Sequence, residues 1–419
     1  MATRLESALS SYRVLDLTEG ECLLAGRLMG DLGADVIQVE KPGGSPSRSR
    51  SPFYQDIPDL ERSLFWFSFC LNKRSITLDI ETADGQDLLR RLAKTAHFVF
   101  ESFQPGYLDH LGLGYQALSQ INPGIILVSI TPFGQTGPKA QYKWTELVGW
   151  ASSGMLYPSG DPDRPPIITA TPLAGQQGAM AGVLGALTAH WHRRFSGEGQ
   201  HVDVSLQEVM EWNTLCYSQF WPCQHMEMTR VGFGRPLKPG VYLHVGFPCK
   251  DGYAVTCMGA AARWLLKATI NLHQMIEEQG MLPDWLKDYD WSTFDLSKFK
   301  TQEELDKYQD TVKNFMATKT KDEMWQAAVE RGTLTPPVRN FKDNFEDPHF
   351  RSRGFWKDIE HPEVRGSITY PGACFKMTKS PLTFRRRAPL IGEHNQEIYE
   401  QELKLSKEQL LILKSNRVI

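Results

Sequence analysis

Strand-like and helix-like segments alternate along the N-terminal half of this 419-residue chain. Residues 22–33 and 85–96 have helical periodicity, and Gly33 is expected to end the first of these helices. Four apolar runs are expected to be buried strands: residues 13–18, 34–40, 97–103 and 125–134. Strands separated by helices at this spacing predict a parallel sheet covered on both faces, and therefore an α/β fold.

The carboxyl ends of these strands are the expected walls of a ligand site. Ligands on open parallel sheets bind in the crevice outside the strand ends, where the connecting turns meet. The turns concerned follow Thr18, Glu40, Phe103 and Phe133.

A second type of pattern begins near residue 224. Two strands are expected around a turn at Lys250-Asp251-Gly252, and helices are expected to start at Thr301 and Thr320, each with a glutamate three residues later. The predicted organisation has three parts: residues 1–223 as the N-terminal part of a large α/β domain, 224–339 as a smaller α+β domain, and 340–419 as a C-terminal segment that returns to the large domain.

Composition excludes several classes of partner. Lysine and arginine total 46 against 49 aspartates and glutamates, so the net charge of -3 gives no reason to expect nucleic acid. The N-terminus lacks the apolar segment of a signal peptide. The longest apolar run, around residues 179–189, is too short and glycine-rich to cross a bilayer. We expect a cytoplasmic protein with no membrane association.

Metal chemistry is not expected either. The seven cysteines are widely spaced, without a C-x-x-C pair, which argues against a zinc site or a disulfide framework. His190 and His192 are two positions apart on an expected helix, so they point to different faces and make a poor metal pair.

Seven short motifs occur in order from Val14 almost to the C-terminus. They are LGADVIQVEKPGG (32–44), LNKRSITLDI (71–80), ESFQPGYLDHLGLGY (101–115), VSITPFGQTGP (128–138), SGDPDRPP (159–166), SGEGQHVDVSLQE (196–208) and APLIGEHN (388–395). In this combination the chain resembles the class III CoA-transferase family. The resemblance implies a Rossmann-like large domain built from both ends of the chain, a small middle domain, and a dimer in which two chains interlock as rings.

The resemblance also implies a reaction. In this family an aspartate carboxylate attacks the carbonyl of an acyl-CoA and later carries CoA as a thioester, which is covalent catalysis. The substrates are a CoA thioester and a carboxylic acid, with no covalently bound cofactor. Counting forward from Pro165-Pro166 and back from Ser196 places Gly175 at the nucleophile position. Its neighbours Ala174 and Gln176 are not acids, so no catalytic residue is expected there, and Glu146 is the fallback carboxylate.

Positions that hold CoA in the family fall on five residues of this chain. They are Lys41, Lys73, Phe103, His110 and Lys143. His110 stands where the family often has an arginine near the CoA phosphates. A neutral imidazole replaces a permanent fork of donors there, so we expect weaker phosphate binding.

Three functions are compatible with these observations. The first is the non-catalytic subunit of a heteromeric CoA-transferase, whose partner is a homologous subunit that supplies the aspartate. CoA would then move from succinyl-CoA to a carboxylic acid, with (R)-benzylsuccinate of anaerobic toluene degradation as the expected acceptor. The second is a homomeric acyl-CoA racemase, isomerase or lyase with a different base. The third is a non-enzymatic acyl-CoA binder.

Overall fold

A computed structural model describes residues 7–238 and 240–419. The chain divides into two compact units, which are described separately. Unit 1 contains the described residues of 1–155, together with 169–219 and 349–419, and unit 2 contains 156–168 and 220–348.

Unit 1 is built on a six-stranded sheet in which all strands run parallel, as the sequence predicts. The strands are β1 (Arg13–Leu17), β2 (Asp35–Glu40), β3 (Lys73–Thr77), β4 (Phe98–Glu101), β5 (Ile126–Thr131) and β6 (His201–Ser205). Their order is β3-β2-β1-β4-β5-β6, so the direction of winding reverses between β1 and β4. Leu17 pairs with Glu101 in the register, so these two strands end side by side.

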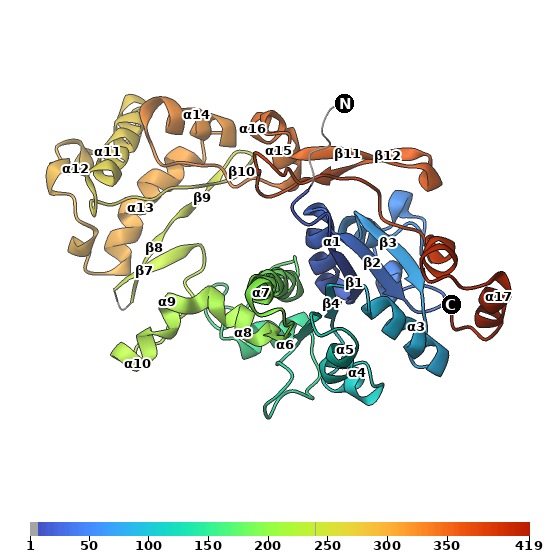
Figure 1. Cartoon of the computed structure of the whole chain (residues 1–419). Helices are drawn as coiled ribbons and strands as arrows, with labels where there is room; N and C mark the ends of the chain where they lie inside the picture. Colours follow the sequence, from blue (N-terminus) through green and yellow to red (C-terminus); the bar gives the residue numbers. More distant parts are fainter. Residues whose placement is uncertain (1–6, 239) are drawn as a thin grey trace. The chain divides into compact units, whose positions relative to one another are not determined.

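Helices cover both faces of this sheet (Figure 1). One face packs against α3 (Ala83–Ala93), α5 (Tyr115–Ile121) and the C-terminal α17 (Lys407–Ser415). The other face packs against α1 (Leu24–Asp31) and the long helix α7 (Ala174–Ser196). Alternate residues of each strand point into the two apolar cores. Both faces of the sheet are therefore buried, as a parallel sheet requires.

Glycines allow α7 to lie unusually close to its neighbours. A Cβ at Gly178 would stand 2.2 Å from a methyl carbon of Leu206, and one at Gly185 would stand 2.7 Å from Val202 Cγ1. The helix ends at Gly197, whose φ of +77° gives the left-handed C-terminal cap that glycine adopts without strain.

Shorter elements complete unit 1. An antiparallel hairpin pairs β11 (Trp356–His361) with β12 (Gly366–Pro371). The short helices are α2 (Leu64–Phe69), α4 (Tyr107–His110), α6 (Glu146–Ser152), α8 (Leu206–Glu211) and α9 (Leu215–Ser218). A 3₁₀-helix, Gly20–Leu23, follows β1 directly.

Unit 2 has its own apolar core between helices and small antiparallel sheets. Its strands are β7 (Gly234–Lys238), β8 (Val241–His244), β9 (Gly246–Cys249) and β10 (Gly252–Val255). Its helices are α10 (Phe220–Gln224), α11 (Arg263–Glu278), α12 (Asp284–Lys287), α13 (Gln302–Met316), α14 (Lys321–Arg331) and α15 (Phe341–Glu346), and α16 (Pro348–Ser352) lies at the boundary with unit 1. Thr301 and Thr320 accept hydrogen bonds from the third helical N–H group of α13 and α14, as their spacing predicts.

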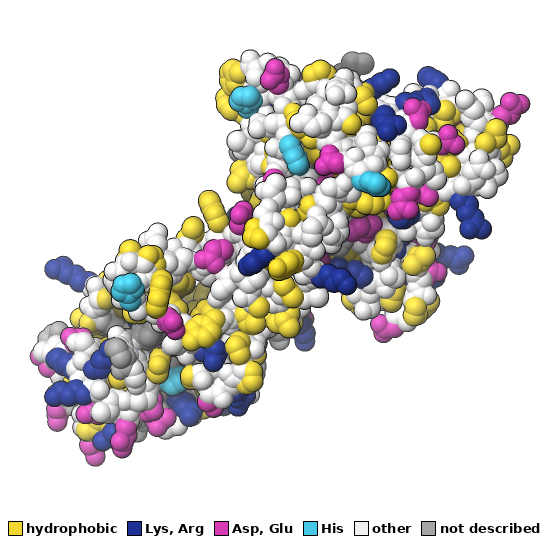
Figure 2. Space-filling model, turned by 90° about the horizontal axis from the view of Figure 1, so that it is seen from below, with side chains coloured by type: hydrophobic (Ala, Val, Ile, Leu, Met, Phe, Trp, Pro, Cys, Tyr) yellow, Lys and Arg dark blue, Asp and Glu magenta, His cyan; other side chains and the backbone are white. Residues whose placement is uncertain are grey.

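The surface carries both signs of charge. On the face drawn in Figure 2, basic and acidic side chains are interspersed, with hydrophobic side chains between them. Among the described helices, none has the length and apolar character needed to cross a membrane.

Candidate active site

The carboxyl ends of β1 and β4 form the crevice at which winding of the sheet reverses. In open α/β sheets this reversal point is where ligands bind. The turns after the two strands are joined directly, because the backbone N–H of Glu19 donates to Ser102 Oγ at 2.9 Å. The predicted site walls after Thr18 and around Phe103 therefore meet in the structure.

Gly175 is the second residue of α7 and is buried. A Cβ on it would lie 2.6 Å from the Cβ of Glu21, in the 3₁₀-helix that follows β1. Glu21 is ion-paired through Oε1 with Arg50 Nη2 at 2.6 Å. Gly175 thus faces a carboxylate-bearing residue of a different segment, with no room for a side chain of its own.

Glu146 holds the start of α7. Its Oε1 accepts hydrogen bonds from the backbone N–H of Leu173 at 2.7 Å and of Ala174 at 3.1 Å, and from the indole N–H of Trp150 at 3.1 Å. The first N–H groups of a helix have no partner within the helix, and an acidic side chain there also favours the helix dipole. Glu146, the fallback carboxylate of the sequence analysis, therefore lies at the N-terminus of the helix that carries Gly175, where it acts as a cap.

Lys73, the second of the five positions matched to CoA binding, is enclosed by the protein. Its side chain is fully buried, and Nζ donates to Asp16 Oδ2 at 2.7 Å, to Leu23 O at 2.8 Å and to Gln38 Oε1 at 2.9 Å. An ammonium group has three N–H donors, and all three are used inside the protein. Lys73 is thus a buried ion-pair residue beneath the crevice, and its ammonium has no N–H group left over for a ligand.

The other predicted CoA-binding residues gather around α4. Lys41 Nζ and the hydroxyl of Tyr107 both donate to Glu81 Oε1, at 3.0 and 2.9 Å, and these hydrogen bonds, the one from Lys41 foremost, lower the pKa of Glu81. The ring of Phe103 lies 4.7 Å from that of Tyr107 between centroids. His110 is the exposed last residue of α4.

Lys143 lies on the loop between β5 and α6 and is exposed. That loop is tied to the start of α4, because Gln141 Nε2 donates to Pro105 O at 3.1 Å. The structure therefore brings Lys41, Phe103 and His110 to one edge of the sheet and holds the loop of Lys143 against it.

Two further carboxylates at the crevice escaped the sequence analysis. Glu101, the last residue of β4, accepts the N–H of Phe103 at 2.6 Å and a hydrogen bond from Ser129, and burial raises its pKa to about 7. Glu19 is partly buried, and this loss of solvation raises its pKa, although Ser45 and Ser47 donate hydrogen bonds to its Oε2. Both lie at or just beyond a strand end, so the rule that points to the turns could also have pointed to them.

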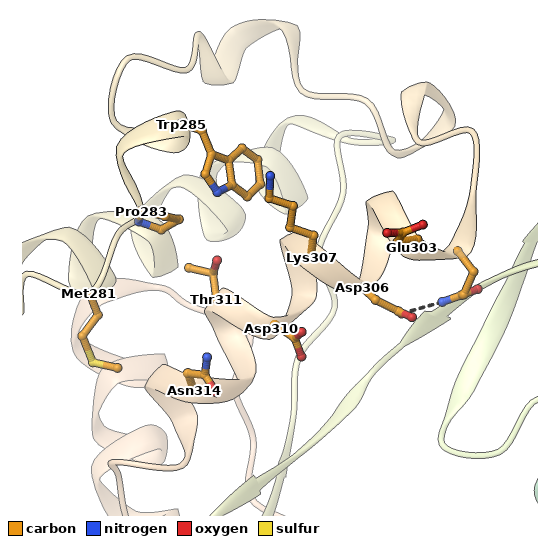
Figure 3. Close-up of a pocket in the computed structure, with 10 residues that line it drawn as sticks. Met281, Pro283, Trp285, Glu303, Asp306, Lys307, Asp310, Thr311 and Asn314 are labelled. Carbon is orange, nitrogen blue, oxygen red and sulfur yellow. Dashed lines mark hydrogen bonds between the residues drawn. The ribbon is translucent and has the colours of Figure 1, made fainter.

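A cavity of about 770 Å³ lies in unit 2, between α12 and α13 (Figure 3). Figure 3 shows Glu303, Asp306 and Asp310 along one side of it, and the ammonium of Lys307 beside the Trp285 indole, 5.1 Å from the ring centroid. Three carboxylates against one ammonium give this lining a negative charge, which repels the phosphates of CoA. The crevice in unit 1 is therefore the better candidate for CoA.

Within residues 7–238 and 240–419, no group of three or more His, Cys, Asp or Glu side chains is placed to hold a metal ion.

The fold and the crevice define a Rossmann-type α/β protein with a ligand site at the carboxyl edge of its sheet. A family model described as CoA-transferase family III matches residues 9–395. The chain belongs to this family, which confirms the resemblance seen in the sequence.

Individual relatives agree with the family. The chain is 30% identical to succinyl-CoA:(R)-benzylsuccinate CoA-transferase subunit BbsE of Thauera aromatica, with 93% of each chain covered. It is 31% identical to succinyl-CoA–D-citramalate CoA-transferase of Chloroflexus aurantiacus, with 98% of each covered. Among solved structures, a CAIB/BAIF family protein from Brucella suis superposes with a TM-score of 0.80 at 25% identity, covering 94% of this chain and 99% of that one.

Family membership fixes the general activity. The chain is a family III CoA-transferase, a class of enzyme that moves CoA between carboxylic acids and takes CoA thioesters as substrates.

Proposed function

We propose that this chain is the non-catalytic subunit of a heteromeric family III CoA-transferase. The observation that carries the proposal is Gly175 at the nucleophile position, buried against Glu21. Neither amide beside it replaces the carboxylate: Gln176 Nε2 donates to Pro172 O at 2.9 Å, and Gln177 exchanges hydrogen bonds with Asn213. A homologous subunit with an aspartate would supply the nucleophile. The name of the Thauera relative, a subunit of a CoA-transferase, supports such an assembly.

The surface of α7 supports assembly with a second chain. Four large apolar side chains on one face of this helix are exposed in the single chain: Met180, Leu184, Trp191 and Phe195. They follow one another at intervals of four, seven and four residues, which places them on one face of the helix. A monomer seldom leaves such a patch uncovered, so we assign this face to the partner subunit in the interlocked dimer.

The CoA thioester is proposed to bind at the edge formed by Lys41, Phe103, His110 and Lys143. The two lysines supply positive charge for the phosphates, and the Phe103 ring supplies a flat apolar surface for the nucleotide base. Because His110 replaces a family arginine, we expect this chain to bind CoA more weakly than its aspartate-bearing partner does.

The acceptor is proposed to be a dicarboxylic acid, with (R)-benzylsuccinate as the first candidate and succinyl-CoA as the donor. Two of the relatives are named for benzylsuccinate and citramalate, and both of these acids are dicarboxylates. A phenyl-bearing acid would need an apolar wall. We assign this wall to Trp144, which follows Lys143 in the chain, and to Phe133, whose ring centroid lies 5.4 Å from that of Trp144.

Turnover measurements test the proposal. Transfer of CoA from succinyl-CoA to benzylsuccinate is expected only from the mixture of this chain with its aspartate-bearing partner, and not from this chain alone. Mutation of the partner's aspartate is expected to abolish it. Turnover by the pure chain would contradict the proposal and favour the homomeric racemase, isomerase or lyase. Tight CoA binding without turnover in either preparation would favour the acyl-CoA binder.

A further inference from the structure

Position 175 is closed by the backbone-proximal atoms of Glu21. An ideal Cβ on Gly175 would stand 2.6 Å from Glu21 Cβ, 3.5 Å from its Cα and 3.6 Å from its carbonyl carbon. Real Cβ atoms essentially never approach another atom closer than 3.0 Å. Only the first of these three contacts is forbidden, so a single carbon atom blocks the position.

The segment that carries Glu21 is held in place on both sides. The N–H of Gly20, whose φ is +59°, donates to Ser47 Oγ at 2.9 Å. Beyond Glu21 itself, Cys22 and Leu23 are buried in the core. The carboxylate is fixed by Arg50, whose guanidinium lies 4.0 Å from the centroid of the Phe65 ring. The Glu21 stem therefore cannot simply rotate away from position 175.

This contact differs from those of the other α7 glycines. Gly178 and Gly185 face methyl groups of Leu206 and Val202, which lie at the outer ends of flexible or rotatable side chains. Gly175 instead faces the Cβ of Glu21, which moves only with the backbone. Close packing of the helix explains why Gly178 and Gly185 are glycines. At Gly175 the reason is the contact with a single residue of the crevice, Glu21.

We propose that Glu21 blocks the nucleophile position of this chain. The inactivity of the chain then depends on two residues together, Glu21 and Gly175. The inference rests on the proposed non-catalytic role and extends it. Loss of the aspartate leaves a site without a nucleophile, and Glu21 fills the space in which one would stand. Glu21 acts here as a blocking residue, through its Cβ, and its own carboxylate stays with Arg50.

Blocking of position 175 by Glu21 would prevent formation of the covalent CoA thioester on an aspartate at that position. In an open slot, an aspartate oxygen attacks the thioester carbonyl of succinyl-CoA and the C–S bond breaks, which gives a mixed anhydride and CoA thiolate. The thiolate then attacks the aspartyl carbonyl, which releases succinate and leaves CoA bound to the aspartate as a thioester. That thioester adds the mass of CoA to the chain, less one water, and is measurable.

A stability cycle tests the geometry independently of any activity. Gly175→Ala is introduced into the natural chain and into Glu21→Ala and Glu21→Gly backgrounds, and each variant is unfolded in urea. Glu21→Ala and Glu21→Gly both remove the Arg50 ion pair, but only Glu21→Gly removes the blocking Cβ. Gly175→Ala is expected to lower the unfolding midpoint in the natural and Glu21→Ala chains and to leave it unchanged in the Glu21→Gly chain. An equal loss in all three backgrounds would overturn the closure.

A labelling experiment tests the chemistry. Gly175→Asp is combined with each Glu21 variant, and the intact chains are weighed after incubation with succinyl-CoA and again after hydroxylamine, which cleaves thioesters. The CoA adduct is expected on Gly175→Asp/Glu21→Gly at a level at least about tenfold above that on Gly175→Asp/Glu21→Ala or Gly175→Asp alone. Equal labelling of all three would overturn the closure and leave the proposed function intact. An adduct on Glu21 of the natural chain would overturn the proposed function itself.

Discussion

Lys73 lies in a sequence motif of the CoA-binding positions, but its side chain forms a buried ion pair within the protein. Its ammonium and the Asp16 carboxylate are both fully buried, and Thr18 satisfies the other oxygen of Asp16 through its N–H and hydroxyl. The ion pair therefore links β1 to β3 across the intervening strand β2, beneath the crevice.

Lys73→Met is expected to lower the free energy of unfolding by about 3–5 kcal/mol, because it leaves the Asp16 charge buried and unpaired. Lys143→Met, at an exposed position, is expected to change stability by less than about 0.5 kcal/mol and to weaken CoA binding. Urea unfolding and titration with CoA separate the two effects. A Lys73→Met chain of natural stability that has lost CoA affinity would restore the original prediction.

Glu101 should make the stability of the chain depend on pH. Burial raises its folded pKa to about 7 from an unfolded value near 4.5, so the folded state holds a proton that the unfolded state has released between these pH values. The unfolding free energy is therefore expected to fall as pH rises from 4.5 to 7, by about 3 kcal/mol from this group. Asp109 and Asp203 add to the rise in pKa, and burial lowers the pKa of the nearby His201.

Glu101→Gln removes this titrating group while it keeps an acceptor for the Phe103 N–H. Its unfolding free energy, measured by urea unfolding at several pH values, is expected to decline less than that of the natural chain over the same pH window. If the two chains lose stability in parallel, the Glu101 carboxyl does not carry the raised pKa.

At the scale of secondary structure, the start of α7 depends on an acid from α6. Glu146→Ala removes an acceptor for two helical N–H groups and is expected to lower the free energy of unfolding by about 1–2 kcal/mol. Glu146→Gln retains an acceptor and loses the favourable charge at the helix N-terminus, for a smaller loss of about 0.3–1 kcal/mol. Urea unfolding of both variants, with exposed Glu198→Ala as a control, tests this order. A turnover defect in Glu146→Gln without any loss of stability would reopen the case for Glu146 as a base.

The same elements show what the sequence could and could not predict. β1, β2, β4 and β5 follow from their apolar runs, since burial on both faces of a parallel sheet requires such runs. β3 was missed because Lys73 and Arg74 open it. Ion pairs allow these two residues to be buried, with Asp16 for Lys73 and with Asp35, Glu397 and Glu402 for Arg74. Partners that lie far apart in the sequence leave no periodic signal. The contact between Gly175 and Glu21 was missed for the same reason, although Gly175 itself was identified.

At the scale of the whole molecule, the apolar face of α7 remains without a partner in the single chain. Leu184 and Trp191 are 69% and 63% exposed, seven residues apart on one helix face. Side chains of this size contribute most of the binding energy where a partner covers them. The proposed assembly therefore depends on this face, which lies on the same helix as Gly175.

Leu184→Glu/Trp191→Glu is expected to prevent assembly, because two charges would be buried in an apolar contact, with a rise in dissociation constant of more than roughly a hundredfold. Native mass spectrometry of the chain with its aspartate-bearing partner gives the oligomeric state directly. Leu411→Glu, which places one charge on an equally exposed leucine of α17, is the matched control and is expected to assemble normally. The circular dichroism spectrum should be unchanged in both variants, since neither site contributes to a core. A double variant that still assembles would place the interface on another surface and remove the support that α7 gives to the heteromeric model.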